Sequence, residues 1–203
     1  MFETFLDRNH NPSHPITFFV SFSTHITSKN KIFINEFHYK NQAFDFAEFV
    51  ELVHSTDLNL SGYALEFYDG ISGQVYKRTE LGNTIPAVTS SDPNGGSVTF
   101  SAYSQVSFHD GPAGIALIDP SGNVVQFLGY GDPSISNVAF TAVNGFASGM
   151  TPSFIGVFEP EDSPLTYSLQ LNGVGSDDRD FQWEEPDFGT PGKINGGQVF
   201  LCD

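Results

Sequence analysis

The sequence predicts an all-β fold of the sandwich or barrel type, and two observations support this. Aromatic residues make up 14% of the 203 residues and include 21 Phe, although only 39% of the chain is apolar. Short runs that alternate apolar and polar residues recur along the chain, separated by clusters of Gly, Pro, Ser, Asn and Asp. Both features are typical of strands rather than helices. A chain of this length is expected to form one domain.

The alternating runs predict strands in chain order at residues 31–39, 46–54, 63–69, 74–81, 97–102, 114–119, 124–130, 154–159, 167–171 and 181–183. Two connections read as tight turns. Residues 118–124 are Ile-Asp-Pro-Ser-Gly-Asn-Val, and residues 69–73 are Asp-Gly-Ile-Ser-Gly. Pro and Gly favour the dihedral angles of such turns. Segments 90–96 and 132–151 are expected to be looser and more mobile, and we consider them candidate recognition loops at the ends of the fold.

We expect residues 31–200 to form the folded domain and residues 201–203 to form a tail. Residues 1–30 are polar and rich in His, and we interpret them as an N-terminal arm, an extra strand or the remnant of a signal peptide. Cys202 is the single cysteine, so no internal disulfide is possible. No apolar run approaches the ~20 residues that a transmembrane helix needs.

The charge balance argues against nucleic acid as a partner. The chain has 24 acidic and 8 basic residues, a formal net charge of -16. Binding to nucleic acid depends mainly on Lys and Arg contacts to phosphate, and a surface this acidic repels a polyanion. The same surplus suits a bound cation or a basic partner. No nucleotide-binding glycine motif is present, so no nucleotide cofactor is expected.

Seven motifs follow one another in an order that resembles the lamin tail domain, in the form found in bacterial extracellular proteins. They are INEFHY at 34–39, EFVEL at 48–52, LSGY at 60–63, DGPAGIAL at 110–117, SLQL at 168–171, DFQW at 180–183 and TPGKIN at 190–195. The resemblance covers most of the chain from residue 31 to residue 200. It implies an immunoglobulin-like antiparallel β-sandwich, in agreement with the strand pattern.

The resemblance also implies a function. Such domains are usually non-catalytic modules, so we expect an extracellular or cell-surface binding or adhesion module and not an enzyme. Its partner would be a protein or a glycan that contacts the end loops. The alternative is an accessory domain of a secreted nuclease or other hydrolase. The chain lacks the basic surface and the heptad rod of nuclear lamins, so a role in the nuclear lamina is not expected.

Carboxylates inside two predicted strands are the main candidates for chemistry. Alternation places Ile32, Ile34, Glu36 and His38 on one side of the first strand. If the first two strands form a hairpin with Glu36 opposite Phe49, then Glu36 and Glu51 are diagonal neighbours on a common face, about 7–8 Å apart.

Three interpretations of these acids remain open. In the first, Glu36, Glu48 and Glu51 accept hydrogen bonds from backbone amides of long loops or from Arg78. In the second, Glu36, Asp45, Glu51 and Asp69 contribute to a Ca²⁺ site that stabilises the fold. In the third, the in-strand carboxylates serve a metal-dependent hydrolase or act as the acid pair of a glycosidase.

Other candidate sites have weaker patterns. The acidic loop 175–180 lacks the spacing of a calcium loop, and the six histidines lack the spacing of a zinc site. His109 beside Asp110 and Ser107 has no nucleophile elbow, so a catalytic triad is not expected there. Tyr63 and Trp183 are expected to lie in the core.

Overall fold

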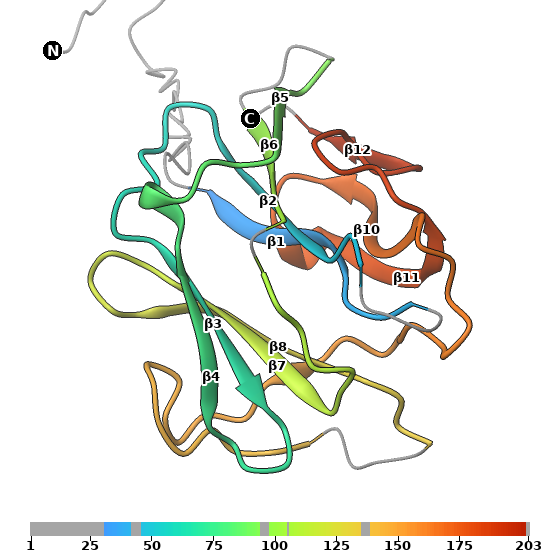
Figure 1. Cartoon of the computed structure of the whole chain (residues 1–203). Coiled ribbons are helices and arrows are strands. Elements are labelled where there is room, and N and C mark those ends of the chain that lie inside the picture. The colour runs from blue at the N-terminus through green and yellow to red at the C-terminus, as the bar shows by residue number, and fades with distance from the viewer. Residues whose placement is uncertain (1–30, 42–45, 94–97, 105, 135–138, 202–203) are drawn as a thin grey trace, which may run out of the picture.

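The computed structural model describes residues 31–41, 46–93, 98–104, 106–134 and 139–201, which form two sheets packed face to face (Figure 1). Sheet A has the order β11-β10-β1-β2-β6-β5, with β12 also paired to β10, and sheet B has the order β4-β3-β7-β8-β9. The strands of sheet A are β1 (Ile32–His38), β2 (Phe49–Ser55), β5 (Val88–Ser91), β6 (Val98–Tyr103), β10 (Tyr167–Gly175), β11 (Phe181–Phe188) and β12 (Gln198–Phe200). Those of sheet B are β3 (Ala64–Asp69), β4 (Val75–Glu80), β7 (Ala113–Ile118), β8 (Val124–Tyr130) and β9 (Ser153–Phe154).

The predicted fold class is therefore confirmed as an all-β, immunoglobulin-like sandwich. Most strand pairs are antiparallel, but β9 pairs with β8 and β12 pairs with β10 in parallel, which the sequence analysis did not foresee. β5 and β12 were not predicted, β10 and β11 extend further than predicted, and β9 is shorter than predicted. The helical elements of the described chain are two three-residue turns, and none of its helices is long enough to cross a membrane.

The central core lies between the two sheets. One side chain in two along each inner strand points into it, and the largest of these side chains are aromatic. Phe37 of sheet A meets Tyr130 of sheet B edge to face, with ring centroids 5.5 Å apart. Tyr63 lies in this core as expected, and Trp183 is half-buried against it, 5.2 Å from Phe37 between centroids. Aromatic contacts of this kind explain why a Phe-rich, Leu-poor sequence forms two strongly buried sheets.

The segment 139–151 covers the outer face of sheet B. This segment is part of the predicted loose loop 132–151, so the prediction is corrected for residues 139–151. Buried Glu66 of β3 holds it there. Its Oε2 accepts hydrogen bonds from the backbone N–H of Phe146 at 2.9 Å and the hydroxyl of Tyr68 at 2.6 Å. Its Oε1 accepts one from Arg78 Nη1 at 2.8 Å, and the Arg78 guanidinium lies 4.9 Å from the centre of the Phe146 ring.

Glu66→Gln should destabilise the protein by about 2–3 kcal/mol, because an amide cannot accept from Arg78, Tyr68 and Phe146 together. Urea unfolding measures this loss, and hydrogen exchange at the Phe146 amide should become faster.

Glu80→Gln is the matched control. Glu80 bonds the same guanidinium at 2.6 Å, but its side chain is 45% exposed, so its loss should change stability by no more than about 0.5 kcal/mol. Equal effects of the two substitutions would contradict the anchoring role of Glu66.

Candidate functional site

A β-bulge at Asn35 decides where the carboxylates of β1 point. Ile34 pairs with Leu52, but Glu36 pairs with Glu51, so Asn35 is an extra residue in β1. Ile34 lies in the central core before the bulge, and Phe37 lies there after it. Glu36 and His38 therefore lie on the side away from the core, not on the side of Ile32 and Ile34 as strict alternation predicted. An extra residue changes the phase of a strand, and the sequence pattern does not show it.

Glu36 and Glu51 are direct cross-strand partners, and neither is accessible to solvent. The prediction of a common face is correct, but the predicted register is not. Phe49 lies opposite His38 rather than opposite Glu36, so the carboxylates are direct instead of diagonal neighbours. Like charges this close on a buried face need other groups to stabilise them.

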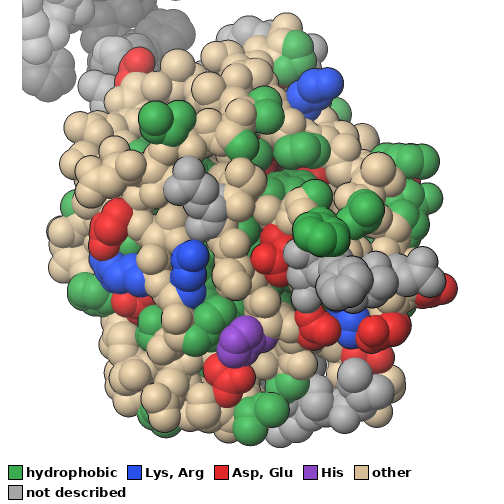
Figure 2. Space-filling view, viewed as in Figure 1, with side chains coloured by type: hydrophobic (Ala, Val, Ile, Leu, Met, Phe, Trp, Pro, Cys, Tyr) green, Lys and Arg blue, Asp and Glu red, His purple; other side chains and the backbone are tan. Residues whose placement is uncertain are grey.

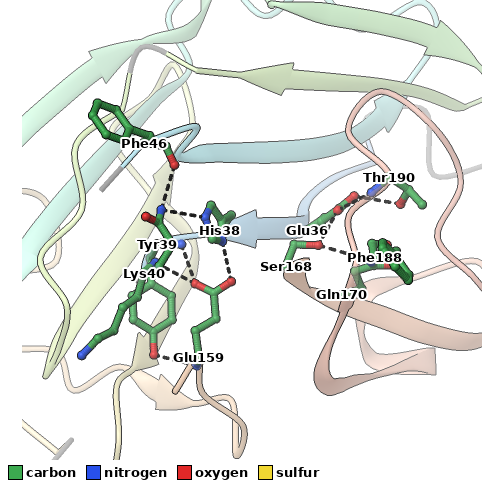
Figure 3. Close-up of polar contacts among 11 residues, drawn as sticks. Glu36, His38, Tyr39, Lys40, Phe46, Glu159, Ser168, Gln170, Phe188 and Thr190 are labelled. Atoms are coloured by element: carbon green, nitrogen blue, oxygen red, sulfur yellow. Dashed lines mark hydrogen bonds and ion pairs between the residues drawn. The ribbon is translucent and has the colours of Figure 1, made fainter. Parts of the chain in front are cut away.

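Glu36 accepts three hydrogen bonds from two segments (Figure 3). Its Oε1 accepts from Ser168 Oγ at 2.6 Å and from the backbone N–H of Thr190 at 2.7 Å. Its Oε2 accepts from Thr190 Oγ1 at 3.0 Å. One carboxylate thus joins β1, β10 and the chain that follows β11.

Glu51 binds the next residues of the same segment. Its Oε1 accepts from Asn35 Nδ2 at 2.8 Å, and its Oε2 accepts from the backbone N–H of Gly192. The backbone N–H of Lys193 donates to Thr190 O at 2.8 Å and closes a turn in this segment. Glu36 and Glu51 together hold residues 190–193, the Thr-Pro-Gly-Lys of the TPGKIN motif, over the outer face of sheet A.

The first interpretation of the in-strand acids is therefore confirmed for Glu36 and Glu51, with backbone amides as donors. It is also confirmed for Glu48, whose Oε1 accepts from the backbone N–H of Phe108 at 3.2 Å. The expected role of Arg78 is wrong for these two residues, because its guanidinium bonds Glu66 and Glu80 in sheet B.

Glu36 and Glu51 are both buried, and none of the groups that donate hydrogen bonds to them is basic. These two facts determine the direction of their pKa shifts. Burial and the neighbouring charge of Glu36 raise the pKa of Glu51 well above its ordinary value of 4.5. Burial also raises the pKa of Glu36, and the bonds from Ser168 and Thr190 oppose this shift. The pair takes up a proton at a higher pH than an exposed glutamate does.

A second cluster, formed by His38, Tyr39, Lys40, Asn41 and Glu159, lies at the end of β1 (Figure 3). Glu159 Oε1 lies 2.7 Å from His38 Nδ1, and its Oε2 accepts from the backbone N–H groups of Tyr39 and Lys40 at 2.7 and 2.8 Å. The Asn41 amide donates to His38 Nε2 at 3.1 Å, which places the ring proton on Nδ1, toward Glu159. Burial raises the pKa of Glu159, and the contact with His38 opposes the shift.

The residues predicted to bind calcium do not share one place. Glu36 and Glu51 meet in sheet A, whereas Asp69 ends β3 in sheet B, where it accepts from Ser72 and lies 3.1 Å from His109 Nδ1. Asp45 lies outside the described residues. Within the described residues, no three His, Cys, Asp or Glu side chains gather as metal ligands. The structure places Asp69 in the other sheet from Glu36 and Glu51, and the calcium site stays a prediction.

Two surface grooves flank β11, and the sequence pattern predicted neither of them. The first, of about 410 Å³, is lined mainly by apolar residues, and the second, of about 440 Å³, is lined mainly by polar and acidic residues. The first is lined by Leu128, Ser153, Phe154, Ile155, Phe181, Gln182 and Trp183. The second is lined by Gln170, Asn172, Glu184, Glu185, Asp187, Phe188, Thr190 and Gly196. The polar residues after Trp183 and the single Pro186 are a pattern that fits an edge strand and could have indicated one.

Comparison with protein-family models, with curated proteins and with solved structures gave no match. The resemblance to lamin tail domains thus stays a prediction from the motifs, and the site is interpreted from its own geometry.

Stability should depend on pH through the Glu36–Glu51 pair. Because the pKa of Glu51 is raised on folding, the folded state holds this proton more tightly than the unfolded chain does. The free energy of unfolding therefore falls as pH rises from 4.5 through the raised pKa. Glu51→Gln removes the titrating group, so it should lower stability more at about pH 5 than at about pH 8. Urea unfolding of both proteins across this range measures the difference, and a loss that grows with pH would contradict the assignment.

Gly192→Ala should destabilise the protein by about 1–3 kcal/mol. Gly192 has a φ of +76°, and an added Cβ would collide with the side chain of Val88 in β5. Gly196→Ala is the control on the same segment, because Gly196 is exposed and an added Cβ would have no neighbour within 4 Å. Thermal unfolding compares the two variants. If both retain the parent melting temperature, residues 190–193 are not fixed as described.

Proposed function

We propose that this chain is a non-catalytic binding module that works at a cell surface or outside the cell. The observation that supports this most is the use of the in-strand carboxylates. Glu36, Glu51 and Glu159 are fully or almost fully buried, and their hydrogen bonds go to the protein's own amide, hydroxyl and imidazole groups. A general acid or base must reach a substrate within hydrogen-bond distance, and these groups do not face solvent.

Charge and surface shape support a protein or a glycan as the partner. The net charge of -16 disfavours nucleic acid. Figure 2 shows carboxylates spread over one face of the molecule rather than gathered in one acidic patch. The grooves beside β11 offer apolar, aromatic, amide and carboxylate groups together, a mixture typical of ligand-binding surfaces.

An enzyme panel and a binding screen together test the proposal. The parent protein, Glu36→Gln and Glu51→Gln are assayed for nuclease, glycosidase and esterase turnover, with and without Ca²⁺ or Mg²⁺. The parent is also applied to peptide and glycan arrays. We expect no turnover that depends on Glu36 or Glu51, and saturable binding to at least one class of array ligand. Turnover that either substitution abolishes in a folded protein would contradict the proposal.

A further inference from the structure

The outermost strand of sheet A has an open edge. β11 is the terminal strand of the sheet, and β10 is its one strand partner among the residues that the structure describes. The N–H and C=O groups on the other edge of β11 are therefore placed to pair with an added strand. The pairing of β10 with β11 shifts between Ser168 and Gln170, where Glu185 and Pro186 lie, so residues 181–184 are the regularly paired part of β11.

One groove beside this edge is acidic. Glu184, Glu185 and Asp187 are exposed in it, and no Lys or Arg lines it. Phe188 is 66% exposed. Its ring packs against the ring of Tyr167, with 4.9 Å between the two centroids. Buried Gln170 uses its Nε2 for bonds to Ser168 Oγ and Phe188 O, so its Oε1 is the atom it can offer to a ligand.

The groove on the other side of the edge is lined mainly by apolar residues. Trp183 of β11 and Phe154 of β9 line it, together with Leu128 and Ile155. Successive residues of a strand point to opposite faces, so Trp183 faces this groove and Glu184 faces the acidic one. A strand added to β11 would present its own side chains alternately to the two grooves.

We propose that β11 binds an extended basic segment of another protein, which adds to sheet A as a further strand. Lys or Arg side chains of that segment pair with Glu184, Glu185 and Asp187. The apolar side chains between them enter the groove beside Trp183. This assignment rests on the proposed function as a binding module and names its partner class.

Charge complementarity selects this occupant over a second copy of the chain. Three carboxylates without a basic neighbour in the groove attract cationic side chains. Two copies of β11 paired edge to edge would bring these carboxylates together in molecules that each have a net charge of -16. Acidic residues on an edge strand thus prevent self-pairing and still allow a basic strand to bind.

Trp183 is the single tryptophan, so its fluorescence reports occupation of the apolar groove. The full chain is titrated with three ten-residue peptides: alternating Lys and Val, the same peptide with Glu for Lys, and the same peptide with Pro at every fourth position. We expect a saturable change in Trp183 emission with the Lys peptide alone, and weaker binding at high salt.

Glu184→Lys/Glu185→Lys should weaken binding of the Lys peptide about tenfold or more. Asp57→Lys/Asp162→Lys changes the net charge equally at exposed positions on other parts of the chain and should weaken it by less than about threefold. Circular dichroism confirms that all variants are folded.

Three results would overturn the proposal: no saturable emission change up to millimolar Lys peptide, equal losses in the two double variants, or equal binding of the Pro peptide.

A dimer that Glu184→Lys/Glu185→Lys disperses would identify a second copy as the occupant. A gain of about tenfold in peptide affinity on deletion of residues 1–30 would identify the chain's own N-terminal segment. Either of these results also overturns it. The proposed function fails separately, through turnover that depends on Glu36 or Glu51.

Discussion

Buried glutamates that accept hydrogen bonds from backbone amides are the interaction on which the rest of this structure depends. Glu36 and Glu51 hold residues 190–193 over sheet A, Glu66 holds Phe146 over sheet B, and Glu159 joins its own segment to the end of β1. A segment without regular pairing leaves amide donors that must be satisfied when it is buried. A carboxylate has several acceptor positions and can satisfy several donors at once.

This arrangement explains why carboxylates lie inside apolar runs. Each sheet is covered on its inner face by the other sheet and on part of its outer face by a long segment. All seven residues of β1 are buried as a result. A strand covered on both faces needs apolar residues on both, and a carboxylate is needed where the covering segment presents its amides. Burying two neighbouring acids away from water costs free energy, and the raised pKa of Glu51 reflects this cost.

The sequence was sufficient for the fold class, for most strands and for the hairpin turns, because these depend on local alternation and turn residues. It also placed Glu36 and Glu51 on one face. It could not give their register, because the bulge at Asn35 arises from contacts with residues far along the chain. Gln198 Nε2, for example, donates to Asn35 Oδ1 at 2.7 Å across 163 positions. The edge strand β11 was predicted too short for a different, local reason, because Pro186 and its acidic neighbours interrupt the alternation that predicts a strand.

A single titration tests the central role of the buried glutamates most directly. The side-chain carboxyl carbon of Glu51 and the backbone amide protons of Thr190 and Gly192 are followed together by NMR as pH changes. The structure predicts a carboxyl titration well above 4.5, with both amide protons shifting along the same curve, because the carboxylates accept from them. A titration near 4.5 that leaves these amide protons unmoved would show that the glutamates do not hold the segment, and would contradict the account.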